Sequence, residues 1–237
     1  MFGLKKFTVC VLCFSFFICC CMFSDGEIEY IPVTAGVTPT NTVIIDAGHG
    51  GFDGGAVASD GTPEKDINLQ IALRLCGLLR LHGYEVIMTR TEDTGTEGDP
   101  SASISERKKS DMKERLRIIN ENEDAIFVSI HLNKFTTSAA VGAQVFYSTN
   151  HPDSKVLGQS VQQTVKVLVQ PENERTIKKG TKSTYLLYNA KIPAVIVECG
   201  FLSNSRELEL LKTQEYQSKM AFAVFCGIDE YKKNIGV

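Results

Sequence analysis

The sequence predicts an α/β fold: a three-layer αβα domain built on a mostly parallel, twisted sheet. Two observations lead to this prediction. Short apolar runs rich in β-branched residues alternate along the chain with segments whose apolar residues recur at helical spacing. Strands and helices in strict alternation are typical of a parallel sheet covered on both faces. In such folds, ligands bind beyond the carboxyl ends of the strands.

Five apolar runs predict the strands of this sheet. The fourth run is short, and we expect it at an edge of the sheet. The runs cover residues 43–45, 84–89, 125–130, 143–147 and 194–197.

The helices are predicted from apolar stripes and from capping residues. Thr62 is a plausible N-cap with Pro63 as the first helical residue, and this helix ends near Gly83. Ser103 and Glu106 have the spacing of a capping box. The basic residues of that second helix, Arg115 among them, are mixed with acids and are expected to form a solvated face, with the alternative that one or two line a substrate groove. Further helices are predicted around residues 157–168 and from 204 onwards, with 172–184 forming a loop.

The chain divides into three parts. Residues 1–24 carry Lys5 and Lys6 followed by an uncharged apolar run, which indicates a signal peptide or a membrane anchor. The charge arrangement would leave the rest of the chain outside the cytoplasm. Residues 25–41 are polar and read as a linker, and residues 42–235 form the folded domain.

Composition excludes some classes of function. The formal net charge is −3 and no basic stretch is concentrated enough to indicate nucleic-acid binding. Of the eight cysteines, only Cys76, Cys199 and Cys226 lie beyond the first part of the chain. They are far apart in sequence, so a zinc–thiolate site or a disulfide framework is not expected.

Four residues able to bind metal or move protons are predicted at one edge of the sheet. His49 lies in a glycine-rich loop after the first strand, and His131 and Glu198 directly follow two later strands. Glu64 lies in the first turn of the helix after that loop. Singly, each has an ordinary structural explanation, such as an acid that complements the helix dipole. Together, two histidines and a carboxylate suit a hydrolytic zinc, with a second carboxylate moving protons.

The motifs that carry these residues also resemble a known family. They are VIIDAGHGGFDGG, EKD, SIHLN and VECGFLSN, in that order. They look like the zinc-dependent N-acetylmuramoyl-L-alanine amidases, and the resemblance runs from Val43 to the C-terminal helix. It implies that Zn²⁺ is bound by His49, Glu64 and His131, and that Glu198 is the general base and acid. The residues alone leave open which glutamate binds the metal.

Two further polar residues adjoin the predicted site, and each has two readings. Asn133 either hydrogen-bonds the substrate or is a turn residue. Asp46 either holds a metal-binding histidine through a hydrogen bond or caps the end of its strand. Cys199, beside Glu198, is not expected to be a nucleophile, because no histidine is left to activate it.

A narrower likeness is to the spore-cortex amidases of endospore-forming bacteria. It rests on the polar loop and ERKKSDMKERLRIIN helix, the short N-terminal segment and the lack of wall-binding repeats. It implies a peptidoglycan substrate, muramic-δ-lactam formation, action at the outer face of the membrane or in the forespore intermembrane space, and an activating lipoprotein partner. Two departures are Ala47, where a proline is common, and Lys134, where a small residue is common.

Other functions remain open at this point. Another zinc peptidoglycan peptidase would share the fold and the ligands. A non-catalytic, metal-containing wall-binding module would also share them. A phosphate-binding loop is disfavoured, because the glycine-rich stretch lacks the G-K-[ST] ending.

Overall fold

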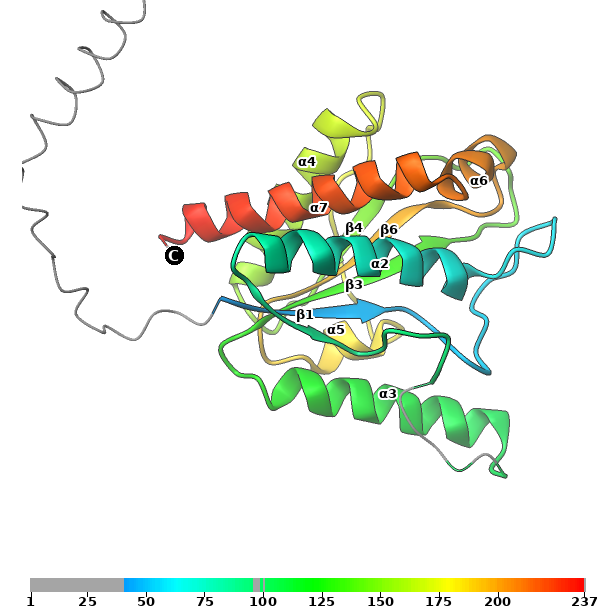
Figure 1. The fold of residues 1–237 in the computed structure, drawn as a ribbon, viewed down its shortest axis with the longest axis horizontal. Coiled ribbons are helices and arrows are strands. Elements are labelled where there is room, and N and C mark those ends of the chain that lie inside the picture. The colour runs from blue at the N-terminus through cyan, green and yellow to red at the C-terminus, as the bar shows by residue number, and fades with distance from the viewer. Residues whose placement is uncertain (1–40, 96–98, 100, 237) are drawn as a thin grey trace, which may run out of the picture. The chain divides into compact units, whose positions relative to one another are not determined.

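A computed structural model describes residues 41–95, 99 and 101–236. Its centre is a six-stranded sheet with the strand order β2-β1-β3-β6-β4-β5 (Figure 1). All neighbouring strands run parallel except β4 and β6, which are antiparallel. The strands are β1 (Thr42–Ala47), β2 (Glu85–Met88), β3 (Ile126–Asn133), β4 (Gln144–Tyr147), β5 (Lys178–Lys179) and β6 (Ala194–Phe201).

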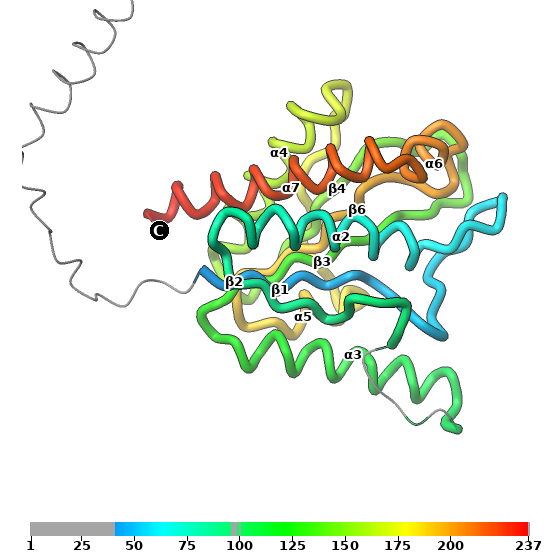
Figure 2. The backbone as a smooth tube through the Cα atoms, in the orientation of Figure 1, coloured from blue at the N-terminus to red at the C-terminus, as the bar shows by residue number. Residues whose placement is uncertain are grey.

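Helices cover both faces of this sheet, which confirms the predicted three-layer α/β architecture. One face is covered by α2 (Glu64–Leu81), α4 (Asp153–Leu168) and α7 (Gln214–Asn234). The other face is covered by α3 (Ile104–Asn120) and the short α5 (Tyr185–Asn189). The tube in Figure 2 shows α6 (Ser205–Leu211) beside the start of α7.

The strands are buried on both sides because their alternate residues enter two different cores. Val43 and Ile45 pack with the layer of α2, α4 and α7, whereas Ile44 packs with the layer of α3 and α5. All three side chains have no solvent exposure. Burial on both faces explains why these strands read as continuous apolar runs, without the alternation of polar and apolar residues.

Two predictions about the second half of the sheet were wrong. The strand at 143–147 is not at the edge, because the two-residue β5 pairs with its outer side. Residues 172–184 were expected to be a loop, yet they contain β5 and are followed directly by α5. Elements of two and five residues are too short to show a periodicity in the sequence.

Two predictions about the helices were also wrong: where the first helix begins, and that the last helix is continuous. α2 begins at Glu64, with Pro63 at the capping position and no side-chain cap. Thr62 instead belongs to a tight hairpin, in which its carbonyl accepts a hydrogen bond from the Ala58 N–H (2.8 Å). The predicted final helix is two helices, α6 and α7. The Thr213 side chain accepts a hydrogen bond from the Tyr216 N–H and is the N-cap of α7. The capping box of Ser103 and Glu106 is confirmed in both its hydrogen bonds.

The predicted signal or anchor at 1–24 and nearly all of the predicted linker at 25–41 lie outside the described residues. Within the part of the chain that the structure describes, no helix combines the length and the apolar character needed to span a membrane.

Candidate active site

The sheet brings the predicted site residues together toward the carboxyl ends of its central strands. His131 and Glu198 were predicted to follow their strands, but they lie within β3 and β6, which continue to Asn133 and Phe201. In the register of β3 and β6, His131 lies directly opposite Glu198. The loop after β1 is tied to β3 by a hydrogen bond from the Gly48 N–H to the Ile130 carbonyl (3.1 Å). Parallel neighbours end at the same edge, so residues far apart in sequence meet there.

The loop after β1 holds His49 in an unusual backbone conformation. Its φ is 61°, and among the described residues it is the one non-glycine with a positive φ. Asp53 compensates for this strain with a short side-chain contact, Oδ2 to His49 Nδ1 at 2.9 Å. Gly50 and Asp53 exchange two backbone hydrogen bonds that close the loop. Gly55 leaves space beside the ring, because an added Cβ would lie 2.6 Å from His49 Cδ2.

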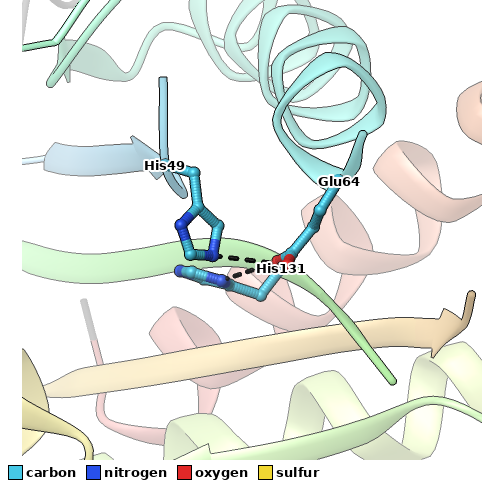
Figure 3. A group of neighbouring side chains, drawn as sticks. All are labelled: His49, Glu64 and His131. Carbon is cyan, nitrogen blue, oxygen red and sulfur yellow. Dashed lines mark hydrogen bonds and ion pairs between the residues drawn. The ribbon is translucent and has the colours of Figure 1, made fainter. Parts of the chain in front are cut away.

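The Glu64 carboxylate contacts both imidazole rings from the side of α2, as Figure 3 shows. Its Oε2 is 3.3 Å from His49 Nε2, and its Oε1 is 3.0 Å from His131 Nδ1. The two rings meet edge to face, with centroids 5.0 Å apart. One donor atom from each of the three residues can be chosen so that all lie within 4.8 Å of one another. Two histidines and one carboxylate at this spacing fit a zinc site with an open position.

The Glu64 carboxylate is fixed by hydrogen bonds from its surroundings. The N–H of Ala56 donates to Oε2 (3.0 Å), and the N–H of Leu132 and the amide of Asn68 donate to Oε1 (3.0 and 3.1 Å). The residue is only 3% exposed. Burial alone would raise the pKa of Glu64, but hydrogen bonds from His131 and His49 hold it well below its usual range. The carboxylate is therefore preorganised as an anion.

Neighbouring carboxylates favour the charged form of both imidazoles. Burial works against this charge, yet hydrogen bonds to Asp53 and Glu64 raise the pKa of His49 to about 9. The pKa of His131 is also raised, because Glu64 outweighs the cost of burial. Such a concentration of negative charge around two imidazoles would equally suit a divalent cation in place of the protons.

Glu198 differs from Glu64 in its surroundings. Its Oε2 is buried and has no hydrogen-bond partner among the described residues. Burial raises the pKa of Glu198 to about 7, with His131 opposing the shift and Glu64 adding to it. Glu198, His49 and His131 all line a cavity of about 340 Å³ between β6, α3 and the start of α5. A carboxyl with a pKa near neutrality and a free oxygen can both accept and return a proton.

A buried arginine lies beneath the loop and corrects two predictions. Arg115 of α3 is fully buried, not solvent-facing, and pairs with Asp46 (2.5 Å) and Asp111 (2.8 Å). The hydrogen bonds of the Asp46 carboxylate come from Arg115, Thr89 and Ser129. Asp46 therefore binds this arginine, and the suggested hydrogen bond to a histidine is not seen. The histidine is held by Asp53 instead.

Two guanidinium groups clamp the backbone of the His49 loop. Arg115 donates to the carbonyls of Ala47 (3.1 Å) and His49 (2.7 Å). Arg90, just after β2, donates to the carbonyls of Ala47 (2.8 Å) and Gly48 (3.1 Å). Three successive carbonyls are thus satisfied by charged donors, which fixes the chain that presents the histidine.

The other predicted polar residues lie nearby but are less closely involved. Asn133 ends β3 at an irregularity in the strand register, and its carbonyl accepts from the Leu202 N–H (2.8 Å). Lys134 donates to the Val57 carbonyl (2.8 Å). Cys199 is fully buried, and burial raises its pKa, which agrees with the prediction that it is not a nucleophile.

Comparison with protein families identifies the family of the chain that carries this site. The family described as N-acetylmuramoyl-L-alanine amidase matches residues 43–230, which is nearly the whole described domain. The chain belongs to this family. It is therefore an enzyme, an N-acetylmuramoyl-L-alanine amidase that acts on peptidoglycan.

Similar proteins include a germination-specific amidase and two amidases with solved structures. The amidase is 35% identical to the germination-specific N-acetylmuramoyl-L-alanine amidase of Bacillus subtilis, over 80% of this chain and 78% of that protein. It is 42% identical to the CwlD amidase of Clostridioides difficile, solved in complex with the GerS lipoprotein. That match covers 81% of this chain and 98% of the other, with a TM-score of 0.78. An N-acetylmuramoyl-L-alanine amidase from Clostridium difficile 630 matches at 31% identity and a TM-score of 0.71, covering 84% and 100% of the two chains.

Sequence reasoning missed Asp53, Arg90 and Arg115 around the amidase site. Asp53 had a usable signal, since it lies four residues after His49 in the same glycine-rich loop. Arg115 also had a signal, because it lies three residues after Met112 and four before Ile119, beside the apolar stripe of its helix. Arg90 had none, because nothing at a strand end shows that a side chain points inward.

Proposed function

We propose that the amidase is zinc-dependent, with Zn²⁺ held by His49, Glu64 and His131 and with Glu198 as the general base and acid. The observation that carries this proposal is the contrast between the two glutamates. Glu64 contacts both imidazoles and both its oxygens accept hydrogen bonds, whereas one buried oxygen of Glu198 has no hydrogen-bond partner among the described residues. The first environment suits a metal ligand and the second suits a group that exchanges protons.

The reaction is hydrolysis of the amide between the lactyl group of N-acetylmuramic acid and L-alanine. When bound, Zn²⁺ would act as a Lewis acid toward the attacking water and the amide carbonyl. Glu198 takes a proton from the water as its oxygen bonds to the carbonyl carbon. Glu198 then returns the proton to the alanine nitrogen as the carbon–nitrogen bond breaks. The products are a free lactyl carboxylate and a peptide with an amino terminus.

The test is product analysis with controlled metal content. We expect purified amidase to release peptides beginning with L-alanine from peptidoglycan, to lose this activity after chelation and to regain it with added Zn²⁺. Release of peptides cut at an internal bond would instead indicate a peptidase. Unchanged activity after complete metal removal would overturn the zinc dependence.

We further propose that the substrate is spore-cortex peptidoglycan and that the reaction precedes muramic-δ-lactam formation. The support is similarity to the germination-specific amidase and to the CwlD amidase. Removing the peptide frees the lactyl carboxyl, which a lactam requires. We expect spores of a deletion strain to lack muramic-δ-lactam in mass spectra of digested cortex, and the presence of normal amounts would contradict this role.

The location and the partner are proposed on the same basis. We propose that residues 1–24 direct export or anchor the amidase, that residues 25–41 link this segment to the catalytic domain at 42–235, and that the enzyme acts outside the cytoplasm. A lipoprotein partner is proposed because a similar amidase was solved with one. Co-purification of the full chain with a GerS-like lipoprotein of its own organism, and a gain in zinc content or activity, would support this. Full activity of the isolated chain would contradict it.

A further inference from the structure

We propose that the amino-terminal half of α3 binds the peptide portion of the substrate, with Lys109 and Lys113 pairing with its carboxylates. This inference deepens the proposed function and rests on it. The peptide, and not the glycan, is the proposed ligand of this surface.

The surface is a groove along α3 that opens beside the catalytic cavity. Its volume is about 590 Å³. Lys108, Met112 and Tyr185 line both this groove and the cavity that contains Glu198, so the two adjoin. The groove is lined by Ile104, Ser105, Lys108, Lys109, Met112, Lys113 and Tyr185.

The charged side chains of this groove are three lysines, of which one is paired and two have no acidic partner among the described residues. Lys108 pairs with Asp53 (2.9 Å) and so borders the His49 loop. Lys109 and Lys113 are exposed, lie one helical turn apart and form no ion pair with any other described residue. The three acids of α3 are engaged elsewhere: Glu106 in the capping box, Asp111 with Arg115 and Glu114 with Arg117.

The apolar part of the groove argues for a ligand that is partly hydrophobic. Ile104 is 64% exposed and Tyr185 is 39% exposed, although both are large apolar side chains. Exposed apolar side chains that adjoin a catalytic cavity commonly mark a ligand-binding surface.

Charge complementarity selects between the two halves of the substrate. Around the scissile bond the lactyl carboxyl is tied up in an amide, so the glycan presents no charge there. The peptide that leaves carries free carboxylates and short apolar side chains. A groove with two unpaired lysines beside isoleucine, methionine and tyrosine matches the peptide and not the sugar.

The experiment compares two substrates and two double variants. One substrate is a soluble muropeptide with free carboxylates, and the other is the same muropeptide with those carboxylates converted to amides. The test variant is Lys109→Gln with Lys113→Gln. The control is Lys219→Gln with Lys233→Gln on α7, in the layer on the opposite face of the sheet, which removes the same charge.

We expect the test variant to raise KM for the acidic substrate by about three- to tenfold, as for the loss of exposed ion pairs, with kcat nearly unchanged. The amidated substrate should show the raised KM with the wild-type enzyme and no further change in the variant. The control variant should behave as wild type on both substrates. Added salt should raise KM for the wild type on the acidic substrate only.

Two outcomes would overturn the inference: a KM unchanged in the test variant, or an equal rise on both substrates, which would point to the glycan or to a general effect. The comparison of acidic and amidated substrates with the wild-type enzyme needs no variant. It therefore tests the peptide-binding proposal even if the variant is poorly folded. If the wild type cleaves both substrates equally well, the groove proposal fails while the amidase proposal stands. If it cleaves neither at the lactyl amide, the proposed function itself fails.

Discussion

The two glutamates of the site show how environment assigns different roles to the same side chain. Glu64 receives hydrogen bonds on both oxygens and stays ionised, with its pKa held low. Glu198 is buried with one oxygen unpaired, and burial raises its pKa to about 7. Two carboxyls whose environments push their pKa values apart are suited to separate roles. The two roles therefore predict opposite effects of substitution.

The first prediction is that Glu198→Gln abolishes turnover but leaves the metal in place. Loss of a general acid and base lowers kcat by roughly 10²- to 10⁴-fold. Zinc content, measured by elemental analysis of the purified variant, should equal that of the wild type. Glu64→Gln is the matched variant and should lose zinc. A Glu198→Gln enzyme that loses its zinc, or keeps most of its activity, would contradict this division of roles.

The second prediction concerns Asp53, which holds His49 through Nδ1. Asp53→Asn should weaken zinc binding by roughly 10- to 100-fold, because the partner that orients the ring and raises its basicity is replaced. Competition with a chelating dye measures the affinity. At saturating zinc, kcat should recover most of its wild-type value. Asp60→Asn, which breaks an exposed pair with Lys212, is the control and should leave zinc affinity unchanged.

At the scale of residues, the sequence predicted which side chains lie near the carboxyl ends of the strands. It did not predict the side-chain hydrogen bonds that hold those residues in place. His49, His131 and Glu198 were predictable because each follows an apolar run, and parallel strands end at one edge. Asp53 and Arg115 act through the orientation of side chains in a folded loop and helix. Arg115 adjoins the apolar stripe of Met112 and Ile119 and the exposed Arg117 does not, but this spacing does not show which groups the buried guanidinium binds.

At the scale of elements, α3 has one buried cation that holds the site and several exposed ones that do not. The third prediction is that Arg115→Met lowers the free energy of unfolding by about 3–5 kcal/mol, because Asp46 and Asp111 are left buried without their partner. Urea unfolding measures this. Arg117→Met removes a surface network with Glu114 and Glu121 and should change stability little. Equal losses of unfolding free energy in the two variants would contradict a special role for the buried arginine.

The fourth prediction is a pH dependence from the same buried pair. Burial would raise the pKa of Asp46, but Arg115 and hydrogen bonds lower it from 3.8 to about 2. A lowered pKa in the folded state means that the stabilisation is complete above about pH 4 and is lost as the pH falls toward 2. Asp46→Asn should therefore cost about 2 kcal/mol at pH 7, and the difference from wild type should shrink below pH 4. Unfolding curves at pH 7, 5, 4 and 3 test this; a constant difference would contradict it.

The long elements were predictable and the short ones were not. β1, β3, β6 and α2 are long enough for their apolar pattern to dominate. α5 and β5 form because Leu186 and Leu187 fill the second core and because β4 offers an open edge, both of which are tertiary effects. The break between α6 and α7 depends on a single cap at Thr213.

At the scale of the whole domain, the candidate metal ligands connect three segments that are distant in sequence. His49 follows β1, Glu64 opens α2 and His131 lies on β3. Two contacts between Glu64 and the rings, at 3.3 and 3.0 Å, join the candidate ligands of these segments directly. A bound ion would tie the same segments together in the folded state and not in the unfolded chain.

The fifth prediction follows from this linkage: zinc stabilises the fold. At a free zinc concentration of 100 times Kd, the free energy of unfolding should rise by about 2.7 kcal/mol, provided the unfolded chain binds no zinc. Thermal unfolding with and without chelator measures the difference. His131→Ala should remove most of the response to zinc, whereas His151→Ala, a change in a half-buried histidine outside the site, should keep it. Because the increment grows with the logarithm of zinc concentration, a titration separates specific binding from a general salt effect. An unfolding midpoint that does not move with zinc would mean that the three side chains do not hold the ion together.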